Sequence, residues 1–262
     1  MDTKKLISFD LKADFGFFRK PDLNSGMVLS YNMLHKPALL GILGAITGLS
    51  GYEKYGDFPE YYKVFKDIPI GIAPLDGFHE KGNFQKTNIK YTNTVGYANA
   101  DGNLLIEENT LIKPAYKCFV LFDLAIAEHQ KAHNNIMNCC AEYVPYFGKN
   151  EFSTWWNLES VEEYSFEEFT FDKEFRIDSL FIKNYSNALK STKKEPKTTF
   201  KGNFFSSSFS YFERLPIGFN ENLKQYELAE MAFTDWWLMP ETELENLYKV
   251  ENQDFKYIIQ LI

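Results

Sequence analysis

The sequence predicts an α+β protein, and three observations support this class. Residues 5–11 alternate apolar and polar side chains, which is the pattern of a strand with one buried face. Residues 37–49 begin with a proline, which the first position of a helix tolerates best, and continue as an apolar segment. Residues 81–117 are rich in Asn, Thr, Tyr and Lys around a turn signal at 99–103, so we expect a protruding two-stranded hairpin.

The rest of the first 155 residues supplies a turn-rich loop, at residues 13–36, and four more elements. We expect a short helix, a strand, a buried strand and a second long helix. In chain order these are residues 60–66, 68–73, 116–123 and 128–143. The order strand, helix, strand, inserted hairpin, strand, helix is that of a ferredoxin-like (RRM-like) sheet with helices on one face, the plan of RNA-recognition modules.

Beyond residue 155 the sequence changes to short strand patterns. These are expected at residues 165–171, 175–182, 198–212, 230–238 and 256–262. We therefore predict a ferredoxin-like domain at residues 1–155, which includes the hairpin, or thumb, insertion at about 81–113. The second part, residues 156–262, is predicted to be a C-terminal β-rich subdomain.

Charge and composition argue against several classes of protein. The net charge of −8 argues against nucleic acid, because phosphate binding needs clustered Lys and Arg. Residues 159–178 hold eight acids against two basic residues, however, so the rest of the chain is nearly neutral. The longest apolar segment, residues 38–49, contains three glycines, and the N-terminus has the pattern of a strand, so we expect neither a membrane span nor a signal peptide. Three cysteines without framework spacing favour a reducing cytoplasm.

The first helix raises two hypotheses. Gly41, Gly44 and Gly48 share one helical face, and each weakens a helix by about 1 kcal/mol relative to alanine, so close backbone packing is expected to compensate. Lys36 and the first-turn amides behind His35 lie where the amino end of a helix receives an anion such as phosphate.

Six short motifs occur along the chain. They are residues 15–19 (FGFFR), 34–37 (LHKP), 40–46 (LGILGAI), 113–116 (KPAY), 146–149 (YFGK) and 213–216 (ERLP). As an ordered set they resemble the CRISPR-associated Cas-five family of type I effector complexes, most strongly over the first 50 residues. Members of that family often have arginine where this chain has Lys36, and a small hydroxyl residue where it has Pro37. Lysine holds phosphate as a point charge without the bidentate fork of arginine.

The resemblance implies a ferredoxin-like body whose thumb helps to cap the 5′ handle of the guide RNA (crRNA) in a surveillance complex (Cascade). It also implies contacts with the backbone and large subunits, access to target DNA through the complex, a role in antiviral defence, a cytoplasmic location, type I-B, and no cofactor or metal. The hairpin segment fits, because it has five lysines against three acids and tyrosines that can stack on bases. The candidate RNA-binding residues are Arg19, Lys20, Ser30, Tyr31, His35, Lys36, Lys86, Lys90, Tyr91, Tyr97 and Lys149.

Two alternatives to a non-catalytic RNA-binding subunit stay open. One branch of the family, type I-C, is a metal-independent endoribonuclease that processes CRISPR repeat RNA, and such cleavage needs a general base and an acid or cation. Tyr52, His79 and Lys81 are the candidates, but no Lys-His pair lies beside the exit of the hairpin at residues 113–117. A purely scaffolding protein, favoured by the acidic charge and the aromatic richness, is the third hypothesis.

The spacing of His129 and His133 also suits a metal site. Gln130 stands where a zinc protease motif has glutamate, and no third ligand is evident, so we expect a solvated polar helix face instead.

Overall fold

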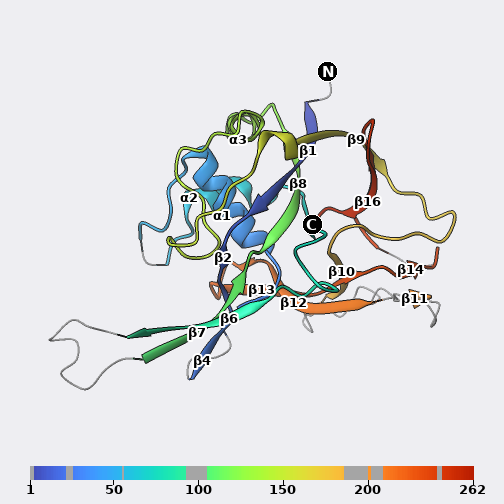
Figure 1. The fold of residues 1–262 in the computed structure, drawn as a ribbon. Coiled ribbons are helices and arrows are strands. Elements are labelled where there is room, and N and C mark those ends of the chain that lie inside the picture. Colours follow the sequence, from blue (N-terminus) through green and yellow to red (C-terminus); the bar gives the residue numbers. More distant parts are fainter. Residues whose placement is uncertain are drawn as a thin grey trace.

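The computed structural model describes residues 3–21, 26–54, 56–92, 105–185, 200–201, 209–240 and 244–262. These segments form a mixed α+β structure with few helices and mostly antiparallel sheets (Figure 1), so the predicted α+β class is confirmed. No helix in these segments is long and apolar enough to span a membrane.

A six-stranded antiparallel sheet forms the centre of the molecule. In spatial order its strands are β16 (Lys256–Gln260), β15 (Leu247–Glu251), β9 (Glu162–Glu168), β1 (Lys4–Lys12), β8 (Ala115–Asp123) and β5 (Ile70–Pro74). Both faces of the central strands are buried, since Ile7 and Phe9 belong to the core beside the helices and Leu6 to a second core on the other face. This double burial explains why β8 is apolar at nearly every position.

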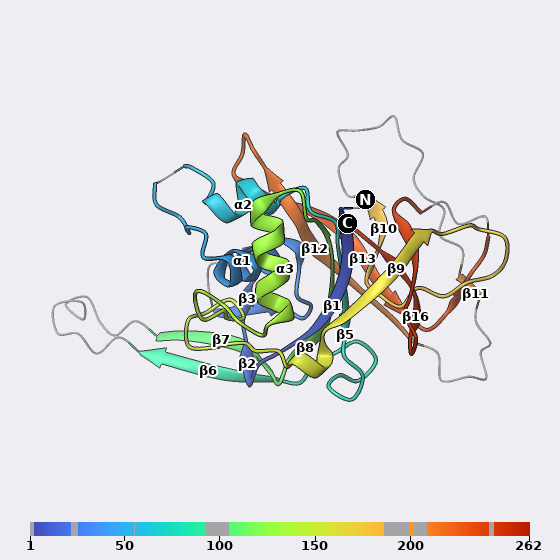
Figure 2. The same cartoon turned by 90° about the horizontal axis from the view of Figure 1, so that it is seen from above.

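Three α-helices pack against one face of this sheet, as Figures 1 and 2 show. They are α1 (Lys36–Thr47), α2 (Glu60–Phe65) and α3 (Ala127–Met137), and a short 3₁₀ helix lies at Leu158–Ser160. α1 starts after His35, whose Nδ1 accepts a hydrogen bond from the amide of Ala38. It ends at Gly48, which has a left-handed backbone (φ +83°) and donates its amide to the carbonyl of Gly44.

Close packing by the glycines of α1 is confirmed for Gly44. A Cβ at Gly44 would collide with the Cβ of Tyr61 on α2 and lie 2.9 Å from its Cγ. α1 and α2 therefore approach more closely than a larger residue would allow. Gly48 ends the helix, and a Cβ there would also lie 3.0 Å from the side chain of Glu142.

Two predictions about the elements are wrong. The second long helix ends at Met137 rather than at residue 143, because Asn138 leaves helical geometry and Cys139 has a left-handed backbone (φ 54°). Residues 13–36 are not only a loop. They contain the strands β2 (Phe15–Gly16), β3 (Phe18–Arg19) and β4 (Met27–Tyr31).

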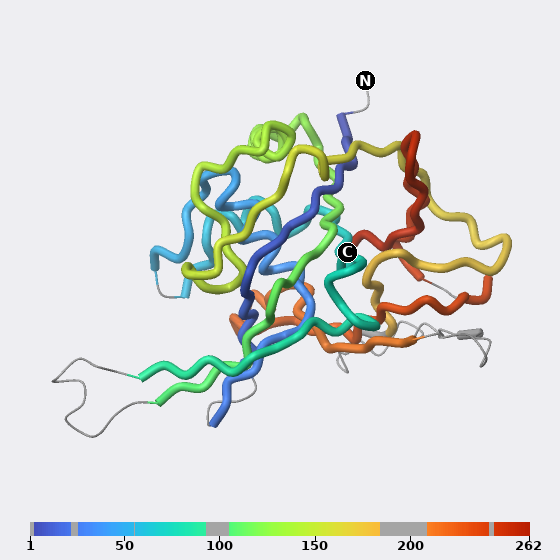
Figure 3. Tube along the Cα trace, viewed as in Figure 1, coloured from blue at the N-terminus to red at the C-terminus, as the bar shows by residue number. Residues whose placement is uncertain are grey.

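The expected hairpin consists of β6 (Lys86–Thr92) and β7 (Leu105–Ile112), which pair antiparallel and project from the body (Figures 1 and 3). Its root is tied to the N-terminal region, because β7 also pairs with β2 and, in parallel, with β4. The expected turn at residues 99–103 and the candidate Tyr97 lie outside the described residues.

The C-terminal part adds a second antiparallel unit. Its strands are β10 (Phe181–Tyr185), β13 (Gln225–Thr234) and β12 (Ser210–Asn220), with a short pair formed by β11 (Phe200–Lys201) and β14 (Trp237–Leu238). Strands of this part also extend the central sheet, since β9 pairs with β1 and β15, which the sequence patterns missed, pairs with β9. The division at residue 155 stays a prediction.

Candidate nucleic-acid interface

The two faces of the hairpin carry different residues. β6 alternates between exposed and half-buried positions, with Lys86 and Lys90 on the exposed face and Tyr91 on the opposite face. Lys90 Nζ is 2.7 Å from Glu107 Oε1 on the neighbouring strand. Partial burial lowers the pKa of Lys86, against a smaller opposite effect of the Glu213 carboxylate. The structure thus does not bring the three described hairpin candidates to one face.

Lys149 connects the hairpin to the body of the protein. Its Nζ is 2.6 Å from Glu108 Oε2 on β7 and 4.3 Å from the ring centre of Tyr91 on β6. Burial alone would lower the pKa of Lys149, but the hydrogen bond and the charge of Glu108 raise it overall. The amine that was expected to contact RNA is therefore charged and already held by the hairpin.

The candidate residues just before α1 face the interior. The Ser30 hydroxyl accepts a hydrogen bond from the amide of Phe18 (2.9 Å) and donates one to the carbonyl of Tyr31 (2.6 Å). Tyr31 itself is only 2% exposed. Burial lowers the pKa of His35 to about 3, so its imidazole is neutral and caps α1 through Ala38.

Lys36 also points inward, although it opens α1. Its Nζ donates a hydrogen bond to the main-chain oxygen of Ile262 (3.0 Å). Burial lowers the pKa of Lys36 to about 8, against a smaller opposite effect of Asp67. To reach a phosphate, Lys36 would have to leave this internal partner.

A carboxylate of the chain itself organises the segment before α1. Glu213 accepts hydrogen bonds from the amides of Asn32 and Met33 (3.1 and 3.2 Å) and from the Tyr211 hydroxyl (2.7 Å). It also forms an ion pair with Lys20 at 2.8 Å. The predicted RNA contact Lys20 is thus engaged with an internal anion, and Glu213 of the 213–216 motif has a structural role.

An open groove of about 730 Å³ lies beside α1. Its floor includes the small residues Ala38, Gly41 and Ala45 on the half-buried side of the helix. Five tyrosines also line it, namely Tyr52, Tyr61, Tyr143, Tyr146 and Tyr226. Three of these rings are open to solvent, with exposed fractions of 64% for Tyr52, 60% for Tyr143 and 43% for Tyr146.

The groove has a positive charge available at Arg19. Arg19 is exposed on β3 and has no ion-pair partner within the part of the chain that the structure describes. Among the described lining residues the one acid is Glu108, which is paired with Lys149. Burial raises the pKa of both Tyr61 and Tyr226, so these phenols are neutral at physiological pH. Aromatic rings, hydroxyl groups and an available cation suit a polyanion with exposed bases.

Sequence analysis identifies Arg19 but misses the tyrosines of the groove as binding residues. Tyr52 is singled out only as a candidate base, and Tyr146 only as part of a family motif. The tyrosines come from segments far apart in the chain, and only the fold gathers them. The one available signal is the high count of 16 tyrosines.

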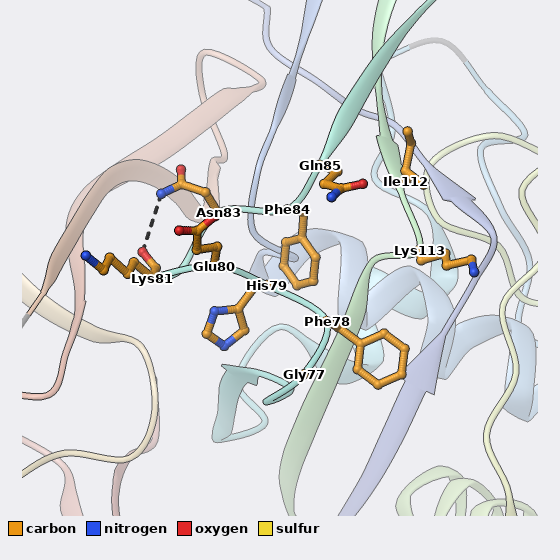
Figure 4. Close-up of a pocket in the computed structure, with 10 residues that line it drawn as sticks. All are labelled: Gly77, Phe78, His79, Glu80, Lys81, Asn83, Phe84, Gln85, Ile112 and Lys113. Atoms are coloured by element: carbon orange, nitrogen blue, oxygen red, sulfur yellow. Dashed lines mark hydrogen bonds between the residues drawn. The ribbon is translucent and has the colours of Figure 1, made fainter. Parts of the chain in front are cut away.

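A second pocket, of about 780 Å³, lies at the root of the hairpin (Figure 4) and is lined by residues 77–81, 83–85 and 112–113. His79 Nδ1 accepts a hydrogen bond from the amide of Gly82 (2.9 Å), and burial lowers the pKa of His79. Lys81 and Lys113 lie on opposite sides of the pocket in Figure 4. Tyr52 lines the groove instead, so the three candidates for catalysis do not meet in one site.

The sequence predicts a solvated face for both histidines of α3, and this prediction is wrong for His129. His129 is buried, accepts a hydrogen bond from the amide of Asp123 (3.3 Å) and stacks on Phe65 with ring centres 5.5 Å apart. No group of three or more potential metal ligands occurs in the described segments.

No family model matches the sequence, and no curated protein matches it. Several solved structures are similar to this chain. A CRISPR protein from Archaeoglobus fulgidus is 12% identical over 98% of this chain and 99% of its own, with a TM-score of 0.46. A chain of a CRISPR RNA-guided surveillance complex is 10% identical over 88% and 90%, with a TM-score of 0.44. A chain of the type III-B Cmr-beta complex bound to cognate target RNA is 10% identical over 90% and 86%, with a TM-score of 0.48. At these values the likeness establishes neither a family nor a function for this chain.

Proposed function

We propose that the chain is a non-catalytic subunit of a type I CRISPR surveillance complex that binds the 5′ handle of the guide RNA. In this role it contacts the backbone and large subunits and meets target DNA through the complex. The observation that carries the proposal is the groove beside α1, where Arg19 has no internal partner among the described residues and stands among five tyrosines. The ordered sequence motifs support the choice of family, and type I-B and a cytoplasmic location are part of the same proposal.

We also infer that the core of the protein is ferredoxin-like. Without the hairpin insertion, the short strands β2 to β4, the short α2 and the 3₁₀ helix, the chain runs through β1, α1, β5, β8, α3 and β9. In space these four strands lie in the order β9, β1, β8, β5, and each neighbouring pair is antiparallel. This arrangement is a split β-α-β-β-α-β unit, a plan that RNA-recognition domains share.

The expected chemistry of binding is electrostatic at Arg19 and along the exposed face of the hairpin. A guanidinium binds phosphate with two parallel hydrogen bonds, which a lysine cannot supply. Lys86 and Lys90 occupy exposed positions of β6, where Lys90 would exchange its partner Glu107 for a phosphate. The acidic segment does not oppose this, since no described acid between residues 159 and 178 lines the groove.

The test is the salt dependence of guide-RNA affinity, measured on the complex assembled with its partner subunits. Arg19→Ala, Lys86→Ala and Lys90→Ala combined should weaken binding and reduce the log-log salt slope by about one for each phosphate that is no longer neutralised. The matched control is Arg176→Ala with Lys173→Ala, two exposed cations of the C-terminal part. An unchanged affinity and slope in the triple variant would rule out this interface, and a flat slope in the wild type would favour a scaffold.

The second candidate function is a metal-independent endoribonuclease, because the root pocket places His79, Lys81 and Lys113 around one cavity. We expect no cleavage, since the His79 ring is held by Gly82 and packs edge-on against Phe84 and Phe233. The experiment is to incubate the pure protein with a CRISPR repeat hairpin in EDTA. A site-specific product with a cyclic phosphate end would establish the enzyme instead.

A further inference from the structure

We infer that the groove beside α1 is a pocket for unstacked nucleobases of single-stranded RNA, in which tyrosine rings stack on the bases and Arg19 holds a flanking phosphate. The inference rests on the proposed function and deepens it. A handle gripped through phosphates alone would need cations but no pocket, whereas base insertion needs both.

The size and the walls of the groove fit a base. Its volume of about 730 Å³ lies within the range of about 300–1,000 Å³ that small-molecule pockets occupy. The exposed rings of Tyr52, Tyr143 and Tyr146 offer flat faces, and every base has a π-face that can stack on them. Tyrosine hydroxyls can also bond to base edges, which phenylalanine or leucine walls could not do.

The charges of the groove favour RNA over a protein segment as its occupant. Arg19 supplies a cation that no described residue pairs with, while the carboxylate of Glu108 is neutralised by Lys149. Burial raises the pKa of Tyr61, so its phenol is neutral and adds no negative charge. An anion therefore meets no repulsion from the described lining residues.

Gly41 provides an independent indication that the groove has a function. Gly44 and Gly48 each have a structural reason, the first in its contact with Tyr61 and the second in its left-handed backbone. Gly41 has neither. A Cβ at Gly41 would lie 3.8 Å from the nearest atoms of Tyr61, an ordinary contact, and its backbone is helical. Because alanine would favour the helix at this position, the missing methyl group is best explained by space for a ligand on the groove floor.

The first experiment locates bases in the pocket. Guide RNAs carrying 2-aminopurine at successive handle positions are bound to the complex assembled with its partner subunits, and their fluorescence is measured. We expect strong quenching at one or more positions, because stacking on tyrosine quenches this base, and recovery of the signal in Tyr52→Leu and Tyr146→Leu. The same leucine variants should lower handle affinity by about five- to a hundredfold, whereas Tyr52→Phe and Tyr146→Phe should keep most of it.

The matched control is Phe255→Leu, which removes a ring as exposed as Tyr146 (43%) but outside the groove. This variant should bind guide RNA as the wild type does. Gly41→Ala gives a second measurement that misfolding cannot imitate. It should lower handle affinity by at least about threefold while leaving the melting temperature unchanged or higher, because alanine favours the helix.

The outcomes separate the inference from the function on which it rests. If RNA binds but no handle position is quenched and the tyrosine variants bind normally, the grip is by phosphates alone and the base pocket is wrong. If the tyrosine variants lose a partner subunit but keep RNA affinity, the groove binds protein and the inference is equally wrong. If the assembled wild-type complex does not bind guide RNA through this subunit, the proposed function itself fails.

Discussion

Two neighbouring regions of α1 contain the kinds of residue that bind RNA, yet the structure uses them differently. At the amino end, His35 and Lys36 have their partners inside the protein. In the groove beside the same helix, Arg19 has no described partner and the ring of Tyr52 is open to solvent. The chemical type of a residue therefore does not reveal whether it is available for a ligand. Availability depends on what the rest of the fold places against it.

The difference between these two regions is tested most strongly by removing the internal carboxylate of Glu213. Glu213→Ala deprives two amides and Lys20 of their acceptor, so we expect the free energy of unfolding to fall by about 3–5 kcal/mol. Urea unfolding measures the change, with the exposed Glu53→Ala as the control at about ±0.5 kcal/mol. A decrease below about 1 kcal/mol would show that the amino end of α1 is open to external anions.

The second prediction concerns the pH dependence of stability at Lys36. Burial lowers its pKa from 10.5 to about 8, so between these values the unfolded chain binds more protons at this residue than the folded chain does. Stability relative to Lys36→Met should therefore rise by about 2–3 kcal/mol from pH 8 to 10.5 and stay level below pH 8. Urea unfolding of both proteins at several pH values tests this. A constant difference across that range would mean that the ammonium group is solvated, as a phosphate-binding lysine would be.

The third prediction separates positioning from RNA contact at Lys149. Lys149→Met leaves the buried Glu108 without its ion pair, so we expect stability to fall by about 2 kcal/mol and hydrogen exchange in β6 and β7 to become faster. The salt slope of RNA binding should not change, whereas Arg19→Ala should reduce it by about one. Adding Glu108→Gln should recover part of the stability, because it removes the unpaired charge. A reduced slope in Lys149→Met would instead make this lysine a phosphate contact.

Much of the fold could be predicted from local patterns. The alternation in β1, the proline and the glycines of α1, and the apolar β8 each depend on nearby residues, and the structure has all three elements close to the expected bounds. Local patterns fail where pairing is long-range. β4 pairs with β7 some 80 residues further along the chain, and β15 joins β9 across a similar separation, so neither strand stands out in its own sequence.

The site was predictable only in part, for a related reason. Arg19 is identified by its motif and remains available in the structure. Lys36 and Lys149 have the right charge, but residues 226 and 41 positions away in the chain hold them. The tyrosines of the groove belong to no common sequence pattern. They lie on α2, on β13 and in loops, and only folding brings them together.

The smallest expected effect distinguishes two glycines of α1: Gly44, which packs against α2, and Gly41, which lines the groove. Gly44→Ala should lower the free energy of unfolding by about 1 kcal/mol, because crowding against Tyr61 exceeds the gain in helix propensity. Gly41→Ala should raise it by about 0.5–1 kcal/mol, since a methyl group there meets only ordinary contacts. Thermal unfolding of both variants measures the opposite signs. If Gly41→Ala were as destabilising as Gly44→Ala, Gly41 would be a packing residue, and its absent side chain would no longer indicate a ligand in the groove.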